Sequence, residues 1–144
     1  MLDRTDSIDQ AHAYRLHRTS RLLRRHLEAT LAPLGISGAQ YGVLWRLHER
    51  DGRVQGELVD PVLDDRPNIT RLVDGLVRRG LVERRRDDED ARRRRVHLTT
   101  AGRSFMKELM PTVLRLRTEL FGGLDEDDLA AFERVLDHVE AQLT

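Results

Sequence analysis

The sequence predicts a mainly α-helical fold with a small β component (α+β), in which a winged helix-turn-helix is flanked by long dimerisation helices. Both ends of the 144-residue chain carry apolar side chains at helical spacing. Between them lie three shorter helical patterns, followed by two segments with the character of β-strands. These patterns divide the chain into an N-terminal helix at 1–36 that is part of the dimerisation region, a winged helix-turn-helix at 37–99 and C-terminal dimerisation helices at 100–144.

The composition is that of one soluble domain with a packed core. The chain has 25 basic and 25 acidic residues, and 39% of its residues are hydrophobic, which is too many for intrinsic disorder. The absence of cysteine excludes disulfides, thiolate zinc sites and cysteine nucleophiles. No stretch approaches the roughly 18 apolar residues of a membrane span, and the N-terminus has acids where a signal peptide has an apolar segment. We therefore expect a cytoplasmic protein with no membrane partner.

The first 35 residues predict one long amphipathic helix. Its leucines recur mostly three, four or seven residues apart, with arginines on the other face, and the pattern ends near Pro33 to Gly35. The run from Ser37 to Gln40 is a capping box that begins a second helix. The residues expected to face inward from this helix are Leu44, Trp45 and Leu47. A short third helix is expected from Gln55 to Val62.

The next helical pattern is the most informative in the chain. Asp65 is a suitable N-cap, and Gly80 followed by Leu81 has the pattern of a Schellman ending. The apolar positions between them, at i, i+3, i+4 and i+7, are Ile69, Leu72, Val73 and Leu76. The opposite face is polar, so this helix is expected to pack on one side and to present the other to a partner.

Two strand-like segments follow, Val82 to Arg86 and Arg93 to Leu98, and they predict a β-hairpin with an exposed charged tip. The region from Arg78 to Arg95 has a net charge of +4, whereas 119–144 has a net charge of −7. One part of the chain is therefore expected to attract polyanions and the other to repel them. Solvated surfaces of helices and hairpins are the alternative interpretation of both regions.

Helices are predicted again after the hairpin, with Thr99 as the cap of the first and Asp125 as the cap of the second. The apolar stripes of the chain's long helices exceed what a central domain of about 60 residues can cover. We therefore expect a homodimer with a two-fold axis.

Short helices followed by a hairpin, with one helix polar on its outer face, indicate DNA binding. In a homodimer, the two-fold axis presents two such recognition helices to a pseudo-palindromic site on double-stranded DNA, with half-sites about 34 Å apart or a multiple of that distance. Arginine and asparagine on that face can read base edges in the major groove, and hairpin arginines can neutralise phosphates. The predicted recognition-helix contacts are Arg66, Pro67, Asn68, Thr70, Arg71 and Asp74. The predicted wing contacts are Arg86, Asp90, Arg92, Arg93 and Arg94. An ordinary solvated helix face is the alternative for Arg71 and Arg78.

These residues carry a resemblance to a known family. The run from Asn68 to Arg84, the triplet Asp90-Ala91-Arg92 and the run from Leu98 to Gly102 resemble the MarR (multiple antibiotic resistance regulator) family of bacterial transcription factors. The resemblance implies a homodimeric winged-helix repressor, or sometimes an activator, that a small, frequently phenolic, acid releases from DNA. It also implies that Asp90 and Arg92 form a wing pair, with Arg92 reaching the minor groove or its phosphates. A simple salt bridge within a turn is the alternative for this pair.

The resemblance also implies an effector pocket between the dimer helices and the DNA-binding lobe, where a cation can hold a carboxylate and aromatic rings can stack on a phenyl group. The candidate residues are His12, Arg15, Tyr41 and Trp45. The alternative is that the two aromatic residues belong to the core and that Arg15 is a surface or interface charge.

Other chemistry finds little support in the sequence. No two of the six histidines are spaced i, i+3 or i+4, and the chain has no phosphate-binding glycine loop and no nucleophile elbow. We therefore expect no metal, no cofactor and no enzymatic activity. Two alternative functions remain: a winged-helix module that binds an acidic protein through its arginine hairpin, and a ligand- or metal-responsive protein that acts by sequestration.

Overall fold

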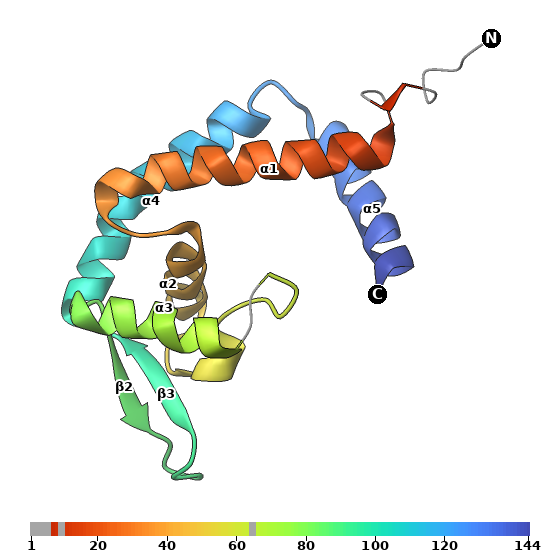
Figure 1. The fold of residues 1–144 in the computed structure, drawn as a ribbon. Helices are drawn as coiled ribbons and strands as arrows, with labels where there is room; N and C mark the ends of the chain where they lie inside the picture. Colours follow the sequence, from red (N-terminus) through yellow and green to blue (C-terminus); the bar gives the residue numbers. More distant parts are fainter. Residues whose placement is uncertain (1–6, 9–10, 64–65) are drawn as a thin grey trace. The chain divides into compact units, whose positions relative to one another are not determined.

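The computed structural model describes residues 7–8, 11–63 and 66–144, without the side chain of Arg66. Figure 1 shows the order of the elements along the chain. The first half contains α1 (His12–Leu31), η3 (Ala32–Leu34), α2 (Gly38–Glu49), β1 (Arg53–Val54) and η4 (Gln55–Glu57). The second half contains α3 (Arg66–Arg78), β2 (Val82–Arg86), β3 (Arg94–Leu98), α4 (Thr100–Phe121) and α5 (Glu126–Leu143). The chain forms two compact units, the first ending at Met106 and the second running from Lys107 to Thr144. The mainly helical winged fold predicted from the sequence is confirmed.

A small antiparallel sheet forms the wing, and its strand order is β1-β3-β2. Strands β2 and β3 pair from Val82 opposite Leu98 to Arg86 opposite Arg94, and they project as a hairpin from the helices (Figure 1). The sequence predicted this hairpin but not β1, whose Arg53 pairs with Val96. A strand of two residues is too short to show an alternating pattern, so only the tertiary pairing reveals it.

Helix α2 begins at the predicted capping box. The backbone N–H of Gln40 donates to the Ser37 hydroxyl at 3.1 Å, and the backbone N–H of Ser37 donates to the Gln40 side chain at 3.1 Å. The residues buried on this helix are Val43, Leu44 and Leu47. Trp45, which was expected to face inward, is only half-buried, and its indole N–H donates to Glu49. At about 100° per residue, position 45 lies far around the helix from the other three.

The predicted helix from Gln55 to Val62 is wrong, because only the single turn η4 forms there. The backbone N–H of Val62 donates to the Asp60 side chain at 2.8 Å, so a local turn replaces the helical hydrogen bonds. Pro61 has no backbone N–H and so cannot donate a helical hydrogen bond. Leu58 is fully buried, whereas Leu63 is 84% exposed.

Helix α3 packs through three of the four predicted apolar positions, Ile69, Val73 and Leu76, which are buried, whereas Leu72 is half-buried. Its end is the predicted Schellman motif. The N–H of Leu81 donates to the Leu76 carbonyl at 3.0 Å and the N–H of Gly80 donates to the Val77 carbonyl at 2.9 Å. This geometry requires a left-handed residue, and Gly80 has φ of 73°. The proposed N-cap, Asp65, lies outside the described residues.

Thr99 caps α4, because its hydroxyl accepts from the N–H of Gly102 at 3.0 Å. In the second unit Asp125 caps α5 by accepting from the N–H of Asp128 at 2.8 Å. No residue of α5 is buried, and Phe121 and Phe132 lie with ring centroids 6.5 Å apart.

Within the described residues, no helix is long and apolar enough to span a membrane.

Candidate nucleic-acid interface

The outer face of α3 presents polar and cationic side chains. Pro67 and Arg71 are exposed and Asn68 is half-buried, and the packed residues lie on the other side of the helix. Arg78 is also exposed, two turns after Arg71. Within the described part of the chain, neither guanidinium has an ion pair or a hydrogen bond. Two cations are thus available to an external partner. The side chain of Arg66, also predicted to contact DNA, lies outside the described residues.

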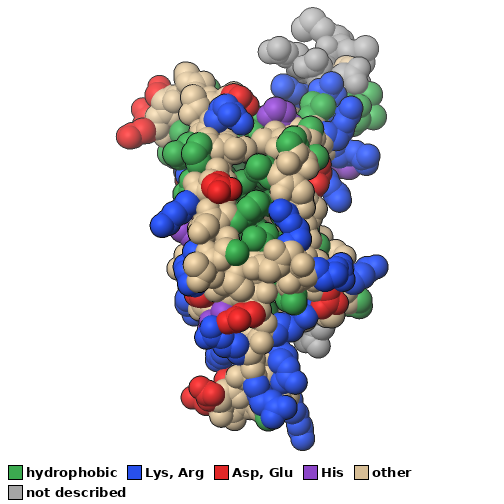
Figure 2. All heavy atoms as spheres, turned by 90° about the vertical axis from the view of Figure 1, so that its left-hand side faces the viewer, with side chains coloured by type: hydrophobic (Ala, Val, Ile, Leu, Met, Phe, Trp, Pro, Cys, Tyr) green, Lys and Arg blue, Asp and Glu red, His purple; other side chains and the backbone are tan. Residues whose placement is uncertain are grey.

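The hairpin carries a second group of arginines. Figure 2 shows basic side chains gathered over the lower part of the molecule, where Figure 1 places the hairpin. Arg86, Arg92, Arg93 and Arg94 are all exposed. Arg94 donates to the Ala91 carbonyl at 3.0 Å, whereas Arg86 and Arg92 have no side-chain partner among the described residues. The exposed cations can therefore approach an anionic surface alongside α3.

Asp87 holds the base of the hairpin tip. Its side chain is only 4% exposed, and its Oδ1 accepts from the backbone N–H of Glu89 at 3.2 Å and lies 3.3 Å from the Nε of Arg95. Its Oδ2 lies 3.9 Å from the Nε of Arg93. The backbone N–H of Glu89 and then the two arginines hold the pKa of Asp87 below its ordinary value, although burial opposes this shift. A sequence pattern of four adjacent acids did not distinguish this residue from its neighbours.

Asp90 also has a local role in the tip. Its Oδ1 accepts from the backbone N–H of Arg92 at 3.0 Å, which forms a turn around the side chain. The structure therefore joins Asp90 to the backbone of Arg92 and not to its guanidinium. That guanidinium extends from the tip without an ion pair in the part of the chain described here.

Two predicted contact residues of α3, Thr70 and Asp74, lie against the wing. Asp74 forms an ion pair with Arg84 at 2.6 Å, and the Thr70 hydroxyl accepts from Gln55 at 3.2 Å. Sequence reasoning missed Arg84 and Gln55. The sequence signal for a shared contact is that helical geometry places positions 70 and 74 one turn apart, so that both can face the same neighbour.

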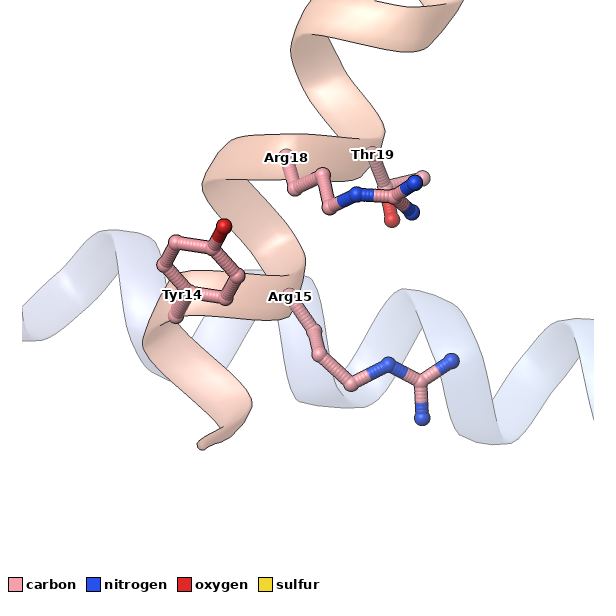
Figure 3. A pocket seen from close by; sticks show the side chains of 4 residues that line it. All are labelled: Tyr14, Arg15, Arg18 and Thr19. Carbon is pink, nitrogen blue, oxygen red and sulfur yellow. The ribbon is translucent and has the colours of Figure 1, made fainter. Parts of the chain in front are cut away.

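The candidate effector residues lie on two helices of the first unit, α1 and α2. A pocket on α1 is lined by Tyr14, Arg15, Arg18 and Thr19, and Figure 3 shows both guanidiniums extending away from the Tyr14 ring. Tyr41 and Trp45 lie together on α2, with ring centroids 6.0 Å apart. Of the four candidates only Arg15 lines this α1 pocket, and a site that all four share stays a prediction. Arg18 was missed because one more arginine in a basic helix carries no distinguishing signal.

Comparisons with known proteins agree with this geometry. Residues 34–93 match the MarR family. The chain is 26% identical over 122 residues to the uncharacterised HTH-type transcriptional regulator YwoH of Bacillus subtilis, covering 85% of this chain and 88% of that protein. It is 30% identical to the solved structure of apo wild-type MarR from E. coli, with a TM-score of 0.71 and coverage of 89% and 96%.

A third similarity concerns the fold alone. The S. aureus MepR–DNA complex has a TM-score of 0.82 against this chain at 21% identity, with coverage of 96% of this chain and 100% of that one. The fold described above therefore matches that of a protein solved in complex with DNA.

Proposed function

Since the chain belongs to the MarR family of DNA-binding transcriptional regulators, we propose that it is a sequence-specific repressor that a small aromatic or phenolic acid releases from its operator. The observation that carries this proposal is the outer face of α3. Arg71 and Arg78 extend from it without partners among the described residues, beside a hairpin that is rich in exposed arginine.

The two groups of arginines suit two kinds of DNA contact. Helix α3 fits the major groove, where Arg71 can pair with guanine, Asn68 with adenine, and Pro67 can contact a thymine methyl group. Arg66 lies at the same end of the helix and completes the proposed reading surface. The wing residues Arg86, Arg92, Arg93 and Arg94 supply phosphate contacts, which add affinity but little sequence information.

We propose a homodimer as the form that binds DNA. Helices α4 and α5 leave Leu114, Phe132 and Val135 exposed, and an apolar surface of this kind is typical of a protein–protein interface. A two-fold dimer presents two copies of α3 to half-sites about 34 Å apart, or a multiple of that distance.

Effector release requires that the ligand bind the DNA-competent and DNA-incompetent states with different affinities. The paired cations Arg15 and Arg18 in the α1 pocket suit a carboxylate. Tyr41 and Trp45 offer a separate aromatic surface. The proposed ligand class is therefore a small organic acid, and its identity is a question for a screen.

The test begins with a duplex that the wild-type protein selects from a randomised pool. Arg71→Ala is expected to weaken binding to this operator by about 1 to 3 kcal/mol, with a much smaller effect on a shuffled duplex, because a base contact is lost. Fluorescence anisotropy at several salt concentrations measures both affinities.

Arg92→Ala is the matched variant from the wing. It is expected to weaken binding to both duplexes. It is also expected to reduce by about one unit the slope of log affinity against log salt concentration, because one phosphate contact is lost. Equal losses on both duplexes for Arg71→Ala contradict its assignment as a base reader. A wild-type protein that enriches no sequence contradicts specific operator binding itself.

A further inference from the structure

The side chain of Arg84, on wing strand β2, connects three separate segments of the first unit. Its Nε donates to the side-chain oxygen of Gln55 at 2.7 Å. Its Nη2 donates to the backbone carbonyl of Thr70 at 3.2 Å and forms the ion pair with Asp74 at 2.6 Å. Strand β2, the turn η4 and helix α3 therefore meet at one guanidinium.

Gln55 closes this arrangement into a ring. Its amide oxygen accepts from Arg84, and its amide nitrogen donates to the Thr70 hydroxyl at 3.2 Å. We refer to Gln55, Thr70, Asp74 and Arg84 as the Arg84 cluster. The side chain of Arg84 is 26% exposed and that of Asp74 is 41% exposed, so both are partly shielded from water. Such shielding makes an ion pair more effective than one on an open surface.

The cluster lies at the edge of the outer face of α3 that is nearest to β2. At about 100° per residue, position 70 lies about a quarter turn from the packed side and position 74 lies at the border of the outer face, three residues after Arg71. What separates Asp74 from the base readers is its ion pair with Arg84. The carboxylate of Asp74 is already held in its ion pair with Arg84, whose Nε and Nη2 also donate hydrogen bonds within the protein. Arg86, two residues further along the same strand, has no such partner among the described residues.

We propose that Arg84 and Asp74 are positioning residues, which fix α3 relative to the wing and so determine DNA specificity without contacting bases. This inference rests on the proposed function. Hydrogen bonds to base edges need donor–acceptor distances of about 2.7–3.2 Å, so a displacement of about 1 Å in α3 removes them. Attraction between arginines and phosphates falls only slowly with distance, so the same displacement leaves nonspecific binding almost unchanged.

The experiment compares Arg84→Lys, Asp74→Asn and the double variant on the operator selected by the wild-type protein and on a shuffled duplex. Lysine keeps the charge but cannot form the forked contact to three acceptors. Each single variant is expected to lose about tenfold in operator affinity, with less than about a twofold change on the shuffled duplex, and the double variant is expected to lose no more than the worse single one. Thermal melting of each variant separates this effect from loss of folding.

Arg85→Lys is the matched control, because it makes the same substitution on the same strand at an exposed position that is given no DNA contact. It is expected to bind both duplexes as the wild type does, since the Arg85 side chain pairs with Glu83, outside the Arg84 cluster. If Arg84→Lys also binds both duplexes as the wild type does, the inference is overturned.

Repeating the selection with Asp74→Asn tests the remaining alternative. A positioning role predicts the wild-type consensus with weaker preference at several positions. A changed base at a single position means that Asp74 reads that base directly, and this overturns the inference while leaving the proposed function intact. A wild-type protein that selects no sequence overturns both, because specificity is then absent.

Discussion

At the scale of single residues, Asp87 shows how a carboxylate can be both buried and ionised. It accepts from the backbone N–H of Glu89 and faces Arg95 and Arg93 at 3.3 and 3.9 Å. These contacts lower its pKa below the ordinary value of 3.8, so its charged form stabilises the hairpin tip. The tip geometry around Arg92 and Arg93 therefore depends on a group that changes charge only in acid.

Asp87→Asn is expected to lower the melting temperature at neutral pH and to have a smaller effect in acid. A lowered folded-state pKa gives stability that is present above the unfolded-state pKa, near 3.8, and is lost as the pH falls through the folded-state pKa. Melting curves at pH 7, 5 and 3 measure the difference between the variant and the wild type. A difference that stays constant from pH 7 to pH 3 contradicts an ionised Asp87.

Residue identity alone did not separate the roles of three aspartates. Asp74 and Asp90 were predicted to contact DNA, and Asp87 was grouped with the charged tip. The structure engages Asp74 with Arg84, Asp90 with the backbone of Arg92, and Asp87 with two arginines. The direct DNA contact of Asp90 stays a prediction, whereas the position of Asp74 beside Arg84 is the basis for its proposed positioning role. Each acid has a structural contact that the sequence did not reveal.

At the scale of elements, α3 is the part of the fold that local sequence describes best. Its apolar spacing, its end at Gly80 and the hairpin after it all follow from short-range patterns, and the structure confirms each of them. Leu76 takes part in both the apolar packing and the end of the helix, because its side chain is fully buried and its carbonyl accepts from the N–H of Leu81. The packing of this helix is thus tied to the way it ends.

Leu76→Ala is expected to lower the free energy of unfolding by about 3 kcal/mol, because it removes buried methyl groups and leaves a cavity. Chemical denaturation monitored by circular dichroism measures this loss. Val77→Ala, at the adjacent exposed position, is expected to change stability by less than about 0.5 kcal/mol. Comparable losses for the two variants are incompatible with the packing described here.

At the scale of the whole molecule, charge and apolar surface are distributed unevenly along the chain. Helix α5 is acidic and has no buried residue, and Val135 on it is 59% exposed. Arginine is concentrated instead around the end of α3 and the hairpin. This separation agrees with a protein that binds DNA through its first unit and a second copy of itself through exposed apolar surface.

Val135→Asp is expected to weaken the proposed dimer by about tenfold or more, because it places a charge in an apolar interface. Operator affinity falls with it, since a monomer binds only one half-site. Sedimentation velocity over a range of concentrations measures the dissociation. Glu133→Gln, on the same helix at an exposed position, serves as the control, and an unchanged dimer for Val135→Asp contradicts this interface.

The sequence by itself determined the features that depend on neighbouring residues: the caps of α2 and α5, the Schellman ending of α3, the β2–β3 hairpin and the separation of charge. The tertiary structure decided the pairing of β1 with β3, the replacement of the expected helix at 55–62 by a turn, and the Arg84 cluster. Arg84 contacts Gln55 and Thr70, which lie 29 and 14 positions away in the sequence. Periodicity and capping act over a few residues, whereas such contacts exist only after distant segments have packed together.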